Sequence, residues 1–269
     1  MDFCLLGPVE ALCGSLKIPV GPPKQQAVLA ALLIDAGQVV TMDELIDRVW
    51  NGTPPDKARA NIYAYVTQLR RVIHEASDGQ PGPLARVGGG YLLDVDPHRV
   101  DVHRFLLLAA ERVPSESDTD VVRRLRSCLD LWRGRPLGGL DGDWACRVRA
   151  WLEHQQSQAV VMLAEAHLRL GEAQEAVRVL NRASLAHPLN ERLAAELIHA
   201  HLAAGQRVEA LRTYTATRQR LVRELGVEPG TELRRLHQTV LAEQTPTRAG
   251  TMPLARPRHG HALACSARK

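Results

Sequence analysis

The feature that most restricts the fold is a repeat in the C-terminal half of the chain. When residues 163–171 (LAEAHLRLG) are aligned with residues 197–205 (LIHAHLAAG), the two glycines coincide at an offset of 34 residues, and residues 175–177 then fall on residues 209–211. This is the period of tetratricopeptide repeats, in which each unit is a helical hairpin that buries its apolar face only against its neighbours. The repeat predicts an all-helical array, and such arrays usually bind proteins.

The rest of this half consists of amphipathic segments with almost no strand signal, so we expect an all-α domain over residues 99–244. Residues 245–269 are rich in Pro, Gly, Arg and small side chains, which cannot form a core, and we expect a disordered basic tail. The tail carries five basic residues and no acidic ones, which leaves 29 basic against 30 acidic groups elsewhere. The net charge of +4 therefore gives no argument for nucleic-acid binding.

The first 98 residues carry strand signals as well as helix signals. Short strands are expected over residues 2–6 and 16–20, and the apolar spacing of residues 24–36 predicts a helix that ends before Gly37. Thr41-Met42-Asp43-Glu44 matches the capping box, in which the threonine and glutamate side chains each accept a hydrogen bond from a backbone amide. A second helix is expected to begin there.

A third helix and a hairpin complete this part of the chain. Two prolines in residues 51–55 end the second helix, and a third is expected over residues 56–75. Gly88-Gly89-Gly90 separates two apolar segments, residues 84–87 and 91–95, as in a β-hairpin. Strands, three helices and a closing hairpin make up a winged helix-turn-helix domain. The predicted fold is thus mainly α with a small β component, an N-terminal winged helix followed by a tetratricopeptide-like helical domain.

The third predicted helix has an apolar and a polar face. On a wheel of about 100° per residue, Ile62, Val66, Leu69 and Ile73 fall on one line, which we expect to be buried. The opposite face carries Ala60, Ala64 and several hydrogen-bond donors, which suit close approach to a DNA groove. An ordinary solvated face would look similar, but the place of this helix before a glycine-tipped hairpin favours DNA. We predict DNA contacts at Thr41, Lys57, Asn61, Thr67, Gln68 and Arg71, and on the flanks at Arg59, Tyr63 and Arg70. Arg86 on the hairpin is expected to reach the adjacent minor groove.

Signals of other chemistry are weak. The three glycines lie between two strands, whereas a nucleotide-binding loop leads from a strand into a helix, and Asp141-Gly142-Asp143 lacks the later ligands of a calcium loop. The five cysteines are odd in number and form no Cys-x-x-Cys pair. We therefore expect no enzyme activity, cofactor or metal. No segment resembles a membrane span or a signal peptide, so a cytoplasmic protein is expected. A repeat adaptor that never touches DNA remains the alternative.

The order and spacing of short motifs resemble the Streptomyces antibiotic regulatory protein family over residues 1–244. The motifs are residues 3–8 (FCLLGP), 38–41 (QVVT), 45–50 (LIDRVW), 65–71 (YVTQLRR), 89–93 (GGYLL), 101–105 (DVHRF), 131–137 (LWRGRPL), 187–192 (HPLNER) and 224–229 (ELGVEP). The resemblance implies an OmpR-type winged helix and a bacterial transcriptional activation domain.

The resemblance also implies a function, which is pathway-specific activation of secondary-metabolite genes. Family members bind tandem direct repeats in double-stranded DNA upstream of promoters, as homodimers or tandem protomers, and recruit RNA polymerase holoenzyme. No Gly-x-x-x-x-Gly-Lys-Ser/Thr motif occurs, so we expect no ATPase domain. We also expect no phosphoacceptor receiver domain, because there is no room for one ahead of the DNA-binding part. The first domain has few lysines, which predicts weak binding by a single protomer and a need for two adjacent repeats or for polymerase.

Overall fold

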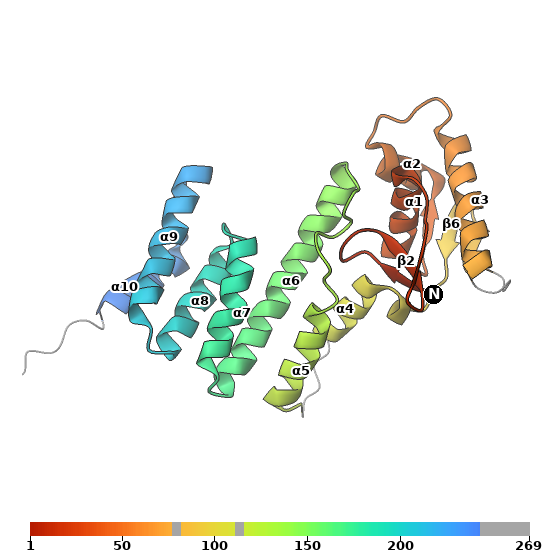
Figure 1. The fold of residues 1–269 in the computed structure, drawn as a ribbon. Helices are drawn as coiled ribbons and strands as arrows, with labels where there is room; N and C mark the ends of the chain where they lie inside the picture. The colour runs from red at the N-terminus through yellow and green to blue at the C-terminus, as the bar shows by residue number, and fades with distance from the viewer. Residues whose placement is uncertain (77–81, 111–115, 243–269) are drawn as a thin grey trace, which may run out of the picture.

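Two three-stranded sheets and three helices form the first part of the protein, which was studied as a computed structural model (Figure 1). The structure describes residues 1–76, 82–110 and 116–242. The first sheet has the antiparallel order β1-β2-β3 and the second has the order β4-β6-β5. The elements are β1 (Asp2–Cys4), β2 (Glu10–Cys13), β3 (Leu16–Ile18), α1 (Pro23–Ile34), β4 (Val39–Thr41), α2 (Met42–Trp50), α3 (Ala58–Ala76), β5 (Leu84–Val87) and β6 (Gly90–Leu93).

The predicted helices of this part are present, while two strands escaped prediction. The capping box is formed: Glu44 N donates to Thr41 Oγ1, and Thr41 N donates to Glu44 Oε2. The unpredicted strands are β2 and β4, of which β2 contains Glu and Ala, both unfavourable in strands. Gly90 pairs with β4 so closely that a Cβ there would lie 2.3 Å from Val40 O, which explains why the hairpin requires a third glycine.

Helices follow one another through the rest of the described chain, as predicted. They are η1 (Pro97–Arg99, a 3-10 turn), α4 (Asp101–Ala110), α5 (Asp118–Leu129), α6 (Asp143–Arg169), α7 (Ala173–Ala186), α8 (Glu191–Ala203), α9 (Arg207–Leu225) and α10 (Thr231–Ala242). Consecutive helices from α5 to α9 pack side by side into an elongated array (Figure 1). The predicted tail, residues 245–269, lies outside the described residues.

The 34-residue repeat is visible in the structure as a repeated turn. Gly171 and Gly205 both adopt positive φ, 77° and 71°, where α6 leads into α7 and α8 into α9. His167 Nδ1 lies 2.6 Å from Glu172 Oε2, and 34 residues later His201 Nδ1 lies 2.8 Å from Gln206 Oε1. Each histidine therefore ties a helix end to the residue that directly precedes the next helix. Alanines at equivalent positions of the two units, 166 and 200 and also 176 and 210, are all buried.

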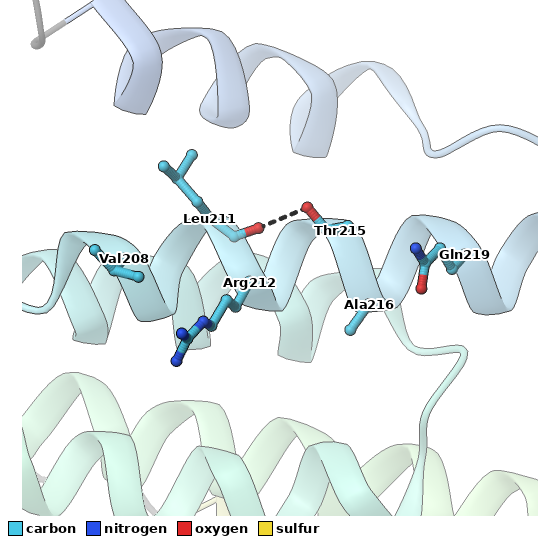
Figure 2. A pocket seen from close by; sticks show the side chains of 6 residues that line it. All are labelled: Val208, Leu211, Arg212, Thr215, Ala216 and Gln219. Atoms are coloured by element: carbon cyan, nitrogen blue, oxygen red, sulfur yellow. Dashed lines mark hydrogen bonds between the residues drawn. The ribbon is translucent and has the colours of Figure 1, made fainter.

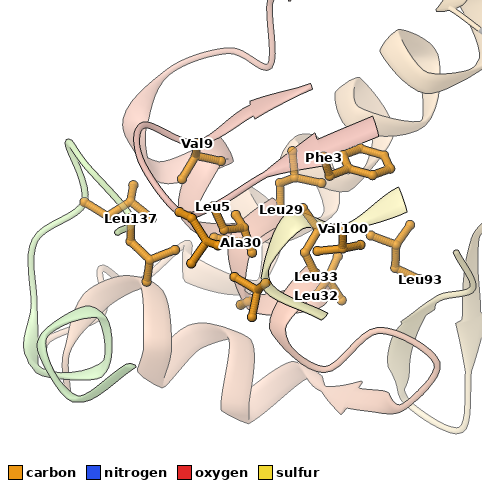
Figure 3. Close-up of a cluster of buried hydrophobic side chains, with 14 of the residues drawn as sticks. Phe3, Leu5, Val9, Leu29, Ala30, Leu32, Leu33, Leu93, Val100 and Leu137 are labelled. Carbon is orange, nitrogen blue, oxygen red and sulfur yellow. The ribbon is translucent and has the colours of Figure 1, made fainter. Parts of the chain in front are cut away.

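One hydrophobic core joins the first sheet to the helical part. Leu5 and Phe3 pack with Val100 and Leu137, which come from far along the chain (Figure 3). The buried carboxylate of Asp101, at the start of α4, accepts hydrogen bonds from Leu5 N at 2.7 Å and Leu6 N at 3.0 Å. Packing is therefore continuous across residue 98, and the first sheet shares a core with the beginning of the helical part.

Candidate nucleic-acid interface

The buried face of α3 lies where its apolar spacing placed it. Ile62, Val66, Leu69 and Ile73 are each 3% exposed or less, and three of them belong to the main core. The helix begins at Ala58, two residues later than expected, and Lys57 lies in the preceding turn, where its carbonyl oxygen accepts from Asn61 N. The register of the helix is nevertheless confirmed.

Fixing the buried face also fixes which side chains point outward. Asn61 is half-buried, while Ala60, Ala64, Thr67, Gln68 and Arg71 are exposed along α3. In Figure 1 this helix lies on the side of the first part away from α7 to α10. The polar face of α3 is thus unobstructed by the described helical array.

Two of the exposed arginines of this region already pair with carboxylates. Arg59 lies 2.5 Å from Asp43 of α2, and Arg71 Nε lies 3.9 Å from Glu75 one turn along α3. The Arg71 and Glu75 side chains are 66% and 67% exposed, so solvent screens their attraction and the pair contributes little to stability. Both arginines can exchange their partner for a phosphate, although the nearby acids reduce the positive potential of the surface.

Thr41 lies at the other end of the site and has a structural role. Its hydroxyl donates to Glu44 Oε2 at 2.7 Å and accepts from the Glu44 amide, which starts α2. The hydrogen bonds from Thr41 lower the pKa of Glu44 below its ordinary value. The role of Thr41 in the cap is therefore established, while its predicted contact with DNA stays a prediction.

The hairpin β5–β6 is attached to one flank of α3. Arg70 Nε donates to Leu84 O at 2.9 Å, and the Arg70 guanidinium lies 5.8 Å from the centroid of the Tyr91 ring. Arg86 of β5 lies 5.5 Å from the centroid of the Tyr63 ring. Burial raises the pKa of Tyr91, which is 3% exposed between the hairpin and α3. Tyr63, Arg70 and Arg86, which the sequence placed on the flanks and the hairpin, are thus brought together.

Sequence reasoning missed the residue that connects this surface to the helical array. Asn51 ends α2 in the left-handed conformation, and its Oδ1 accepts from Asp143 N, the first residue of α6, at 2.8 Å. Beside it, the Arg48 guanidinium of α2 lies 5.7 Å from the centroid of the Trp144 ring. Asn51-Gly52 after a helix is a recognisable C-terminal signal, but nothing in it points to a partner 92 residues away.

Two hollows on the surface lie in the helical array, away from α3. One, of about 380 Å³, is lined by α9 side chains, namely Val208, Leu211, Arg212, Thr215, Ala216 and Gln219 (Figure 2). A second, of about 570 Å³, lies among α5, α6 and α7 and includes Arg126, His167 and Glu175. Within the described residues no group of three His, Cys, Asp or Glu side chains is placed to hold a metal ion. No described helix is long and apolar enough to cross a bilayer.

Comparison with known proteins gives matches to both parts of the chain. The family described as "Transcriptional regulatory protein, C terminal" matches residues 20–93, and the "Bacterial transcriptional activator domain" matches residues 100–241. Regulatory protein AfsR of Streptomyces griseus is 35% identical over 90% of this chain, which spans 24% of AfsR. Transcriptional regulator RedD of Streptomyces coelicolor is 35% identical over 90% of this chain and 71% of RedD.

A solved structure is similar over the same length. It is Mycobacterium tuberculosis EmbR in complex with a low-affinity phosphopeptide, which matches with a TM-score of 0.77 and 32% identity. The match covers 91% of this chain and 65% of EmbR. The similarity therefore extends across the winged helix and the helical array together.

Proposed function

Since this chain belongs to the Streptomyces antibiotic regulatory protein family of transcriptional regulators, we propose that it activates a secondary-metabolite pathway by binding tandem direct repeats upstream of promoters and recruiting RNA polymerase holoenzyme. Residues 1–98 form the DNA-binding part and residues 99–244 the activating part. Such a protein works in the cytoplasm, where bacterial promoters are, and has no catalytic role.

The observation that carries this proposal is the outward polar face of α3 beside the hairpin. Ala60 and Ala64 allow the helix backbone to approach the floor of a major groove, where the neighbouring amides and hydroxyl meet base edges. Arg71 on this face suits a guanine, and Arg86 on the hairpin suits the adjacent minor groove. The proposed base contacts are Asn61, Thr67, Gln68 and Arg71, and the proposed phosphate contacts are Thr41, Lys57, Arg59 and Arg70. Tyr63 is proposed to lie beside the DNA on the same flank.

The charge of this surface supports binding by more than one protomer. Arg59 and Arg71 lie beside Asp43 and Glu75, so the surface attracts phosphates weakly. Phosphate neutralisation supplies most non-specific affinity for DNA. When two protomers bind adjacent direct repeats together, their combined affinity exceeds that of either one alone, which compensates for the weak attraction of each protomer to phosphates.

The shared core supports a fixed position of the activating array on the promoter. The two parts are joined by hydrogen bonds from backbone amides to side chains: the Asp101 carboxylate accepts from Leu5 and Leu6, and the Asn51 amide oxygen accepts from Asp143. An array held in this way keeps a fixed orientation relative to the bound DNA. It can then contact polymerase at a defined position beside the repeats.

The proposal is tested by selecting duplexes from a random-sequence library with the purified full chain and measuring their affinity. Arg71→Ala should weaken binding to the selected duplex by about 1–3 kcal/mol if Arg71 contacts a guanine. Arg212→Ala is the matched control, because Arg212 is also exposed and paired with an acid, Glu209, on its own helix in the distant array. Recovery of no preferred duplex would favour the alternative, a repeat adaptor that does not bind DNA.

A further inference from the structure

Arginines and tyrosines alternate across the boundary between α3 and the hairpin. Tyr63 and Arg70 are seven residues apart on α3, about two helical turns, so both lie on the side that faces the hairpin. Arg86 and Tyr91 are cross-strand partners in β5 and β6. Arg70 packs on Tyr91 and Arg86 packs on Tyr63, so each arginine lies against a ring of the other element.

Arg86 differs from the two α3 arginines that pair with acids. Its contact is the ring of Tyr63, and in the described part of the chain it forms no ion pair, whereas Arg59 and Arg71 have Asp43 and Glu75. The ring attracts the guanidinium through its quadrupole without neutralising its charge. Arg86 is therefore held in place and stays fully positive.

We propose that Tyr63 is a positioning residue, which supports DNA binding through its ring by holding Arg86 toward the minor groove, and not through its hydroxyl. This inference rests on the proposed DNA-binding role of α3 and the hairpin. Arg86 lies on the edge strand of its sheet, two residues before the glycine turn, where a long side chain otherwise samples many rotamers. When the Arg86 side chain is restricted before binding, less conformational entropy is lost as the complex with DNA forms.

The structure also gives a reason why the hydroxyl is dispensable. The attraction of a cation to an aromatic face does not need a phenol, so phenylalanine provides it as well. Because Tyr63 is 39% exposed, its replacement removes little from the core. The contribution of the ring can therefore be measured apart from folding.

The experiment is a double-mutant cycle measured with the full chain and a duplex selected by the wild-type chain from a random-sequence library. The proteins are wild type, Tyr63→Phe, Tyr63→Leu, Arg86→Ala and the Tyr63→Leu/Arg86→Ala double variant. Dissociation constants come from fluorescence anisotropy, and each melting temperature is recorded. Tyr63→Gln, a second variant without a ring, replaces Tyr63→Leu if leucine lowers the melting temperature.

We expect Tyr63→Phe to bind as wild type does and Tyr63→Leu to bind about two- to fivefold more weakly. Arg86→Ala should weaken binding at least as much, and adding Tyr63→Leu to it should have no further effect. The inference is overturned if Tyr63→Phe binds as weakly as Tyr63→Leu, if the losses of the two single variants multiply, or if loss of the ring changes nothing. Failure of the wild type to select any duplex would instead refute the proposed function, on which the inference depends.

Discussion

Asn51 Oδ1 lies 2.8 Å from the backbone nitrogen of Asp143, so the residue that ends α2 also accepts a hydrogen bond from the first amide of α6. The residue preceding α6 is Gly142, which has no side chain to fill that role. Asn51 therefore ends a helix of the DNA-binding part and caps a helix of the activating part. The orientation of the two parts depends on this contact and on the core around Leu5.

Replacing Asn51 should separate its two roles. Asn51→Gly keeps the left-handed backbone, with φ of 55°, and loses only the cap, which we expect to lower the free energy of unfolding by about 1 kcal/mol. Asn51→Ala loses the cap and, unlike Asn51→Gly, keeps a Cβ in that conformation without the short polar side chain that lets asparagine tolerate it, which costs about 1–2 kcal/mol more. Urea unfolding of the full chain measures both. Equal losses for the two variants would show that the backbone conformation is not a constraint.

Leu69→Ala should destabilise the DNA-binding part, because Leu69 is 1% exposed in the core below α3. The cavity is expected to lower the free energy of unfolding by about 2–5 kcal/mol. Gln68→Ala, one position away on the exposed face, is the control and should change stability by less than about 0.5 kcal/mol. Thermal unfolding of both variants is the measurement, and an unchanged melting temperature for Leu69→Ala would show that the helix register is wrong.

Glu10 should make stability depend on pH in the acid range. Hydrogen bonds from Lys17, at 2.5 Å, and from Arg133 lower the pKa of Glu10 below its ordinary 4.5. The folded state thus binds this proton more weakly than the unfolded state, so the stabilisation is present above about pH 5 and is lost as pH falls below 4.5 through the folded-state pKa.

Glu10→Gln tests this by removing the charge. We expect a lower free energy of unfolding at pH 7 and a shallower decline between pH 5 and pH 3, measured by urea unfolding at several pH values. Asp96→Asn, which removes an exposed carboxylate on the turn before α4, is the control. If the variant and the wild type lose stability in parallel, Glu10 has no such role.

Spacing between the repeats should control binding if two protomers lie on the same side of the duplex. Direct repeats are expected with centres about 10–11 bp apart, one helical turn. Inserting about five base pairs turns the second site to the opposite face and should abolish cooperative binding and activation, whereas inserting about ten should restore part of both. Gel shifts and a promoter–reporter assay measure these effects, and undiminished activity after the five-base-pair insertion would rule out the tandem arrangement.

Several features of the protein are determined locally and were readable from the sequence. The 3.6-residue spacing of Ile62, Val66 and Leu69 determined which face of α3 is buried, because no other register removes all three from water. The capping box at Thr41 and the 34-residue period likewise depend on neighbours in the chain. The fold class and the outward face of α3 followed from these patterns.

Other features depend on partners that lie far along the chain, and only the tertiary structure decided them. Strand β4 has three residues and exists because Val40 pairs with Tyr91. The hydrogen bonds of Asp101 to Leu5 and of Asn51 to Asp143 connect residues more than 90 positions apart. A local pattern shows that such groups need a hydrogen-bond partner or a buried surface, but not which distant group supplies it. Only the tertiary structure therefore shows that Tyr63 of α3 contacts Arg86 of the hairpin and that one core joins the two parts.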